Sequence, residues 1–150
     1  MRSRVQFSFE RGGVVIADLA PDLAPQTVRS LLALLPLTAT VYHTRWCGRE
    51  IYLPTTSGGE IPRENQTVQT STGDVTYWRE WDKPNSVAAE AISIYYGPEV
   101  VRDHRGYLLV NVFARVPQRQ WKTIEEIGLR VWQCGIEQVR VSLVRGGRRP

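Results

Sequence analysis

The sequence predicts a mainly β fold, a closed or nearly closed barrel of about eight strands with two helices. Short segments in which apolar and polar residues alternate recur along the chain, only two segments have helical spacing, and glycine, proline or polar clusters separate them. This pattern is typical of a small barrel with helices over its ends. A length of 150 residues and an apolar content of 42% suit one globular domain, residues 1–150.

The chain opens with a predicted β-hairpin and a helix. Residues 5–9 alternate in polarity, a Gly-Gly turn follows, and residues 14–16 are all apolar. A helix is predicted from Pro25, which suits a first helical turn, to the residue before Pro36. Its apolar residues have helical spacing, at Val28, Leu31, Leu32 and Leu35.

A second hairpin is predicted from two β-rich runs, residues 40–46 and 49–53. Between them lie Cys47 and Gly48, a plausible two-residue turn in which glycine supplies a positive φ. Strands joined by such a turn sort their side chains onto two faces. One face is then apolar, with Tyr42, Trp46, Ile51 and Leu53, and the other is polar, with His43, Arg45, Glu50 and Tyr52.

A long polar loop, residues 54–73, follows this hairpin, and loops of that length in a compact domain tend to be functional or disordered. The remaining elements have clearer patterns. Strands are predicted within 74–78, 87–97, 107–116 and 139–143, and a helix within 121–132, with Gly135 as its terminator.

Several motifs resemble known families. Residues 24–28 are similar to the A-P-x-T-V helix start of the cyclophilins. A wider similarity links most of the chain to small uncharacterised bacterial proteins with a cyclophilin-like fold. The residues that carry it are His43, Arg45, Trp46, Gly48, Glu50, Glu64, Asn65, Gly73, Asp74, Tyr77, Trp78, Tyr96, Gly97 and Pro98. The resemblance implies a cyclophilin-like barrel, and the group has no established activity to carry over.

Prolyl isomerase activity is the least favoured function. The cyclophilins that catalyse it have an F-H-R-V-I segment followed by F-M-x-Q-G-G-D. Here His43 and Arg45 are separated by Thr44, and the glycine-rich run is missing.

The predicted polar face of the second hairpin holds the candidate catalytic residues. His43 is a proton donor or acceptor near neutral pH, and Arg45 is a clamp for a carboxylate or carbonyl. Glu50 lies opposite Arg45, would orient it, and is itself a candidate ligand contact. The alternative interpretation is an exposed cross-strand ion pair that contributes little to stability.

Three further residues are candidate ligand contacts. Glu64 and Asn65 lie in the long loop, and Tyr96 lies at the aromatic-Gly-Pro strand end. Loop capping and turn formation are the alternative role for Glu64 and Asn65. The predicted function is binding of a small carboxylate- or amide-bearing ligand in a groove beside residues 41–53, with acid/base chemistry left open. A protein-interaction or homo-oligomeric assembly module is the alternative from another class.

Composition limits the partners. The formal charge of +4 falls to −1 without five terminal arginines, so nucleic-acid binding is not favoured, and residues 145–150 read as a flexible basic tail. No apolar run is long enough to span a bilayer, and no secretory signal is recognisable, so we expect a cytoplasmic protein without membrane association. Neither cysteine has a metal-ligand neighbour, and no cofactor motif is present, so no cofactor or metal is predicted.

Overall fold

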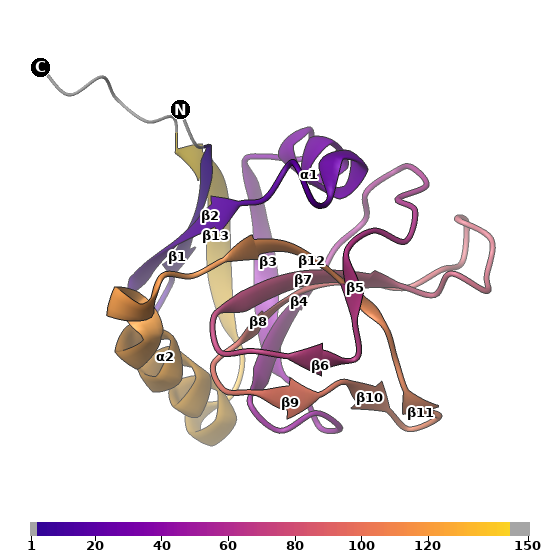
Figure 1. The fold of residues 1–150 in the computed structure, drawn as a ribbon. Helices are drawn as coiled ribbons and strands as arrows, with labels where there is room; N and C mark the ends of the chain where they lie inside the picture. Colours follow the sequence, from indigo (N-terminus) through magenta and orange to yellow (C-terminus); the bar gives the residue numbers. More distant parts are fainter. Residues whose placement is uncertain (1–2, 145–150) are drawn as a thin grey trace, which may run out of the picture.

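The computed structural model describes residues 3–144, so the predicted tail, residues 145–150, lies outside the described part of the chain. Eight antiparallel strands form a barrel in the order β2-β1-β13-β3-β4-β8-β7-β12, which closes where β12 pairs with β2 (Figure 1). The strands are β1 (Arg4–Phe9), β2 (Val14–Leu19), β3 (Leu37–His43), β4 (Glu50–Pro54), β7 (Asp74–Arg79), β8 (Glu90–Tyr95), β12 (Val110–Arg115) and β13 (Glu137–Val144). The predicted mainly β barrel is confirmed.

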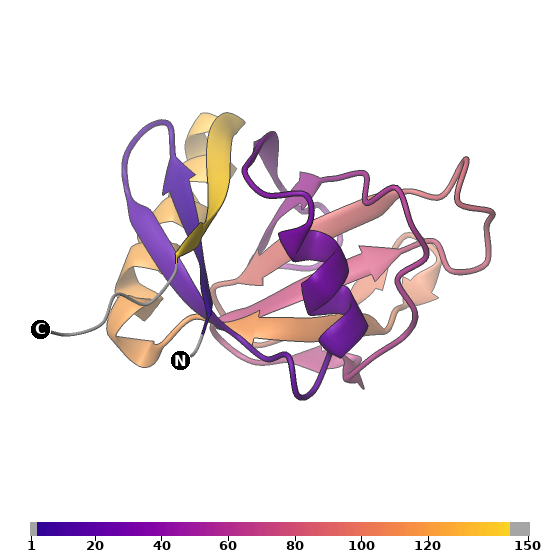
Figure 2. The ribbon, with the colours of Figure 1, turned by 90° about the horizontal axis from the view of Figure 1, so that it is seen from above.

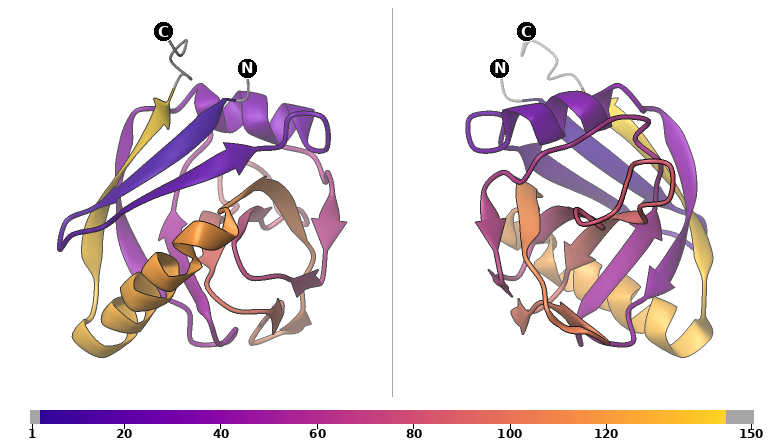
Figure 3. Two further views of the ribbon diagram at one scale, coloured as in Figure 1. Left: turned by 60° about the vertical axis from the view of Figure 1, so that its left-hand side comes forward. Right: turned by 90° about the vertical axis from the view of Figure 1, so that its right-hand side faces the viewer.

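Two α-helices pack on well-separated parts of the barrel. Helix α1 (Pro25–Leu32) lies over the middle of the molecule when it is seen from above (Figure 2), and α2 (Trp121–Cys134) continues from a short 3₁₀ turn, η1 (Gln118–Gln120), and contacts β3 and β4. Figure 3 shows both helices outside the ring of strands. Neither has the length and apolar character needed to cross a bilayer.

The helix ends follow from local chemistry. Helix α1 is shorter than predicted, because the amides of Leu34 and Leu35 bond to carbonyls three residues back and the chain tightens into a turn before Pro36. Helix α2 ends at Gly135, as predicted, where a φ of 88° is accessible to glycine with little strain.

The main core fills the barrel and reaches both helices. Alternate residues of each strand point inward, as Val5, Phe7 and Phe9 of β1 do. The helices add one apolar face each, from Val28 and Leu31 of α1 and from Ile124, Ile127 and Val131 of α2. Each fully buried side chain of this size contributes roughly 1.5–3 kcal/mol of hydrophobic stabilisation.

A second, smaller core lies on the outer side of the barrel. It contains Cys47, Tyr95, Val101 and Val110, packed against Trp78 and Leu108. Short strand pairs accompany it: β5 (Gln66–Thr67) pairs with β12, β6 (Gln69–Thr70) pairs with β9 (Glu99–Val100), and β10 (Arg102–Asp103) pairs with β11 (Gly106–Tyr107). The long polar loop is therefore partly ordered, because its last residues join these pairs.

The predicted register of the β3–β4 hairpin is wrong by one residue. Tyr42 pairs with Tyr52 and His43 pairs with Ile51, whereas a two-residue turn at Cys47 and Gly48 would pair His43 with Tyr52. Residues 44–49 form the connection in place of a two-residue turn. The Thr44 hydroxyl accepts hydrogen bonds from the amides of Trp46 and Cys47, and the Cys47 side chain packs in the second core. A one-residue shift exchanges the two faces of β3.

Candidate functional site

Glu50 occupies the outer face of the barrel at the start of β4. It lies beside Tyr95 of β8 in the strand register, and its carbonyl accepts a hydrogen bond from the amide of Thr44. Burial raises the pKa of Glu50 to about 7, even though the nearby hydroxyls of Ser93, Tyr95 and Thr44 and the Cys47 thiol favour its charged form. The residue is still partly exposed. Glu50 therefore has a titratable carboxyl group that can exchange a proton near neutral pH.

The hydroxyls around Glu50 are not all paired. Thr76 and Tyr95 lie on the same outer face, and both are fully buried. Within the described part of the chain, neither hydroxyl makes a hydrogen bond of normal length, although that of Tyr95 lies near the Glu50 carboxyl group. Buried hydroxyls without partners are uncommon in folded proteins, and a water molecule is one group that can satisfy them. The outer face beside Glu50 thus offers unfilled hydrogen-bonding capacity.

Cys47 lies in the same cluster but lacks the properties of a nucleophile. Its thiol is buried and lies 3.5 Å from the Val100 carbonyl oxygen, to which it donates. Burial and the neighbouring Glu50 carboxylate raise the pKa of Cys47 to about 11, so the thiol stays protonated at neutral pH. Cys47 serves the second core as an apolar side chain.

An aromatic and cationic rim borders Glu50 on the solvent side. Tyr42 and Tyr52 stack with their ring centroids 5.6 Å apart. The exposed Arg45 guanidinium lies 5.6 Å from the centroid of the Trp46 ring. No ion pair joins Arg45 to Glu50 among the described residues, so the predicted cross-strand pair does not form. The cause is the register, because Thr44 takes the place opposite Glu50.

His43 and Tyr96 meet at the end of the barrel that α2 covers. The Nδ1 atom of His43 lies 2.9 Å from the Thr44 carbonyl oxygen and donates to it, which leaves Nε2 to accept from the Tyr96 hydroxyl at 2.7 Å. The His43 ring also packs against the Trp132 ring of α2, with the two ring centroids 4.8 Å apart. Tyr96 lies so close to Gly128 that a Cβ there would be 2.3 Å from its ring. These contacts join the start of the hairpin loop to α2.

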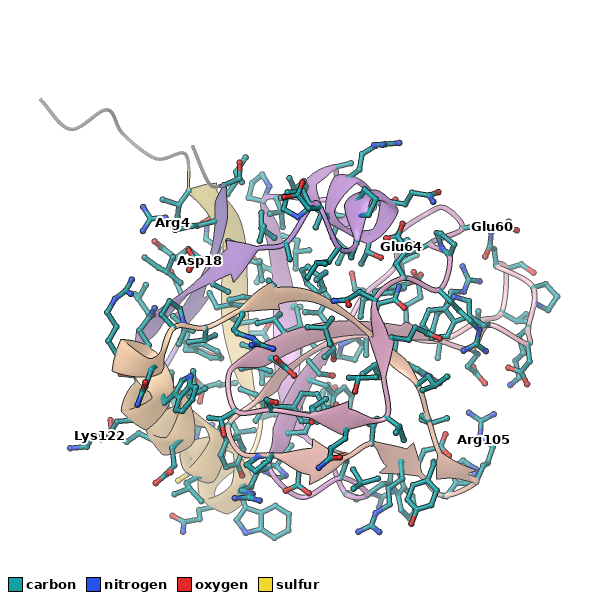
Figure 4. The ribbon with its side chains drawn as sticks, in the orientation of Figure 1. Arg4, Asp18, Glu60, Glu64, Arg105 and Lys122 are labelled. Atoms are coloured by element: carbon teal, nitrogen blue, oxygen red, sulfur yellow. The ribbon has the colours of Figure 1, made fainter. Side chains whose placement is uncertain are left out.

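Glu64 caps the N-terminus of α1. The N-cap residue, Ala24, has no side-chain acceptor, and the Glu64 carboxylate takes its place. It accepts from the amides of Gln26 and Thr27 at 3.1 and 2.9 Å and from the Thr27 hydroxyl at 2.9 Å. Burial acts to raise the pKa of Glu64, but these donations outweigh it and the pKa is lowered. Figure 4 shows Glu64 next to α1, with Glu60 further out on the same loop.

Asn65 has a backbone role beside this cap. It adopts a φ of 43°, and it makes two hydrogen bonds with Val112. The Asn65 side-chain amide donates to the Val112 carbonyl oxygen at 2.9 Å, and the Val112 backbone amide donates to the Asn65 carbonyl oxygen. The fully buried Asn111 supports the arrangement by donating to the Thr27 hydroxyl and accepting from the Glu64 amide. Asn65 also borders an open groove of about 670 Å³ along β2 and β12.

The sequence match that decides the family runs over residues 8–143, nearly the whole chain, and its model is described as a protein of unknown function. The chain belongs to the DUF3830 family. No functionally curated protein matches it significantly.

Solved structures resemble this DUF3830 member in fold. McbB, whose structure was solved in complex with tryptophan, superimposes with a TM-score of 0.71 at 19% identity over 97% of this chain, which spans 46% of the McbB chain. The hypothetical protein AF2241 from Archaeoglobus fulgidus matches with a TM-score of 0.61 at 25% identity over 94% of both chains. At these identities the likeness concerns the fold. The similarity to the cyclophilins stays an inference from the sequence motifs.

In this DUF3830 protein the six predicted site residues fall into three places. Arg45 and Glu50 are on the outer face of the β3–β4 hairpin, His43 and Tyr96 join the barrel to α2, and Glu64 and Asn65 hold the start of α1 and the loop beside it. Tyr95 and Thr76 are the residues that sequence reasoning missed. Alternation in β7 and β8 identifies their face, but only the tertiary structure shows that their hydroxyls are buried.

The donor set of the described residues does not suit a metal ion. No group of three or more histidine, cysteine, aspartate or glutamate side chains gathers within residues 3–144. The side chains near Glu50 are capable of hydrogen bonding, ion pairing and proton transfer.

Proposed function

We propose that this protein binds a small carboxylate- or amide-bearing molecule on the outer face of the barrel, beside residues 41–53, and that Glu50 exchanges a proton with it. One observation carries the proposal. Glu50 is a partly exposed carboxyl group whose pKa is raised by burial to about 7, and it lies beside Tyr95, whose buried hydroxyl makes no hydrogen bond of normal length. At neutral pH both its acid and its base form are well populated, which suits either direction of proton transfer.

The neighbours of Glu50 suit the other parts of such a ligand. Arg45 supplies an exposed cation for a carboxylate, and the stacked Tyr42 and Tyr52 rings offer an apolar surface for a flat group. The complex of McbB with tryptophan makes an aromatic amino acid the first ligand to test, by analogy of fold alone.

The other predicted residues enter the proposal as positioning groups. His43 precedes Thr44 and, through Tyr96, holds the start of the 44–49 loop against α2. Glu64 and Asn65 hold the long loop to α1 and β12. We therefore expect their substitution to change stability first and ligand affinity second.

The test is a titration of isotope-labelled protein with tryptophan and with N-acetyltryptophan amide, which lacks the free carboxylate. Saturable amide shifts confined to residues 41–53 and 93–96 are expected for tryptophan, with at least tenfold weaker binding in Arg45→Gln. Glu50→Gln should remove the change of affinity between pH 6 and pH 8. Arg119→Gln and Glu126→Gln are matched controls at exposed positions. Shifts elsewhere, or none, would refute the proposed site.

An assembly module is the second candidate, because apolar side chains are exposed on and after α2. Leu129, Trp132 and Ile136 are 42%, 62% and 59% exposed. Light scattering over a wide concentration range tests this candidate, and a strict monomer at high concentration would rule out self-association. Prolyl isomerisation remains the least favoured option, and a peptide assay without rate above background would dismiss it.

A further inference from the structure

Arg79, the last residue of β7, is a buried arginine without a carboxylate partner. It is 4% exposed, its Nη1 donates to the Gly59 carbonyl oxygen at 3.3 Å, and its Nη2 donates to the side-chain oxygen of Asn85. The Nε–H has no hydrogen-bond partner in the described part of the chain. A buried cation that contacts only neutral groups is costly unless an anion completes its surroundings.

The carboxylates near Arg79 are held by other residues. Glu80 pairs with Lys83 at 2.8 Å and lies 3.6 Å from Arg105. Glu90, directly opposite Arg79 on β8, accepts from the Tyr77 hydroxyl and from the Ser57 amide. No carboxylate among residues 3–144 lies within 4.0 Å of Arg79. The buried Nε–H therefore lacks a partner among the described residues, and Nη2 has only a neutral one, Asn85.

Two hollows of about 400 and 310 Å³ flank this guanidinium, and Arg79 and Trp81 line both. They lie where the loop of residues 55–65 meets the loop of residues 80–89, which run side by side on the right of Figure 1. The Trp81 indole joins the loops by donating to the Ile61 carbonyl oxygen at 2.9 Å. This place is at the opposite end of β8 from Glu50 and Tyr95.

We propose that these two loops form a second ligand site, for the carboxylate of a small monoanionic molecule. The carboxylate binds side-on to Arg79, with one oxygen on Nε and the other on Nη2, where it replaces the neutral Asn85 oxygen. A flat carboxylate fits this side-on geometry, and a dianion finds no net positive field here beyond that of Arg79, because the two hollows are lined by three acidic side chains and, besides Arg79, by three basic ones. The acidic side chains are Glu60, Glu80 and Asp82, and the basic ones are Arg63, Lys83 and Arg105.

The test replaces Asn85 with aspartate, which has nearly the same shape as asparagine but carries a negative charge. Asn85 is exposed, so Asn85→Asp is expected to fold, and it places a carboxylate on Arg79 from within the chain. Acetate, benzoate and inorganic phosphate are titrated at constant ionic strength, and the Trp81 indole N–H resonance reports on the loops. Arg79→Gln is the direct variant, and Arg119→Gln is the control with the same loss of charge at an exposed position.

The expected result is saturable binding of benzoate and acetate to the wild type and to Arg119→Gln. Binding becomes at least tenfold weaker in Arg79→Gln and in Asn85→Asp, and Asn85→Asp has the higher melting temperature. Unchanged benzoate affinity in Asn85→Asp would overturn the proposal, and so would the absence of saturable binding to the wild type. Phosphate binding as tight as benzoate binding would overturn the carboxylate assignment. Glu50→Gln leaves this binding intact, which separates the two sites.

Discussion

Replacing Glu50 with glutamine tests the energetics of the candidate site directly. Glutamine keeps the shape of the side chain and cannot ionise, so it mimics the protonated acid at every pH. Burial raises the pKa of Glu50 from an ordinary 4.5 to about 7. Between these values the folded protein keeps a proton that the unfolded chain has lost, and so the free energy of unfolding of the wild type falls as pH rises.

The size of the effect follows from the same two values. Each tenfold change in a proton equilibrium corresponds to about 1.36 kcal/mol, so a pKa raised from 4.5 to about 7 removes about 3 kcal/mol of stability by pH 8. The contribution of the protonated carboxyl is complete below pH 4.5 and is lost as pH rises through 7. Cys47 and Tyr95, whose pKa values are raised chiefly by burial, stay protonated over this range and add nothing.

Urea unfolding of both proteins at pH 4.5, 5.5, 6.5, 7.5 and 8 gives the difference in unfolding free energy. Between pH 4.5 and pH 8, the unfolding free energy of Glu50→Gln should rise by about 3 kcal/mol relative to that of the wild type. Taking the difference cancels every group that titrates equally in both proteins. Glu126→Gln, at an exposed helical position, should show no such trend. A flat difference for Glu50→Gln would refute the raised pKa and remove the main support for proton exchange.

Three other substitutions test the contacts around the site. Glu64→Ala should lower the unfolding free energy by about 1–2 kcal/mol, because the first turn of α1 loses its acceptor, whereas Glu60→Ala in the same loop should change little in urea unfolding. Gly128→Ala should cost about 1–3 kcal/mol despite the better helix propensity of alanine, because the new Cβ would lie 2.3 Å from the Tyr96 ring; an unchanged melting temperature would contradict this packing. Tyr96→Phe should cost about 1 kcal/mol, and a double-mutant cycle with His43→Phe should show coupling, whose absence would argue against the hydrogen bond.

Part of the candidate site was predictable because it depends on local pattern. Alternation placed Glu50 and Tyr52 on the polar side of β4 and Ile51 on its core side, and the burial of Ile51 agrees. The position of His43 was not predictable, because the length of the connection decides the register. That length depends on the Thr44 hydroxyl and on the second core, most of whose residues are far away in the sequence.

The capping role of Glu64 was easier to predict from the sequence. A helix that begins at Ala24-Pro25 has no side-chain cap of its own, so its first amides need an acceptor from elsewhere. A carboxylate suits this place because it accepts hydrogen bonds and is stabilised by the positive end of the helix dipole, and a long polar loop can carry it there. Which residue supplies it is decided by the fold, because Asn111 on β12 positions the Glu64 amide.

The sequence by itself determined the eight-stranded barrel and both helices, since strand alternation and helical spacing are local patterns that act over a few residues. Only the tertiary structure decided how deeply Glu50 and Arg79 are buried and which groups surround them. Burial and electrostatic environment are sums over segments far apart in the chain, such as the 44–49 loop with β8 and the 55–65 loop with the 80–89 loop. The proton affinity of one residue and the unpaired charge of the other arise from those long-range contacts.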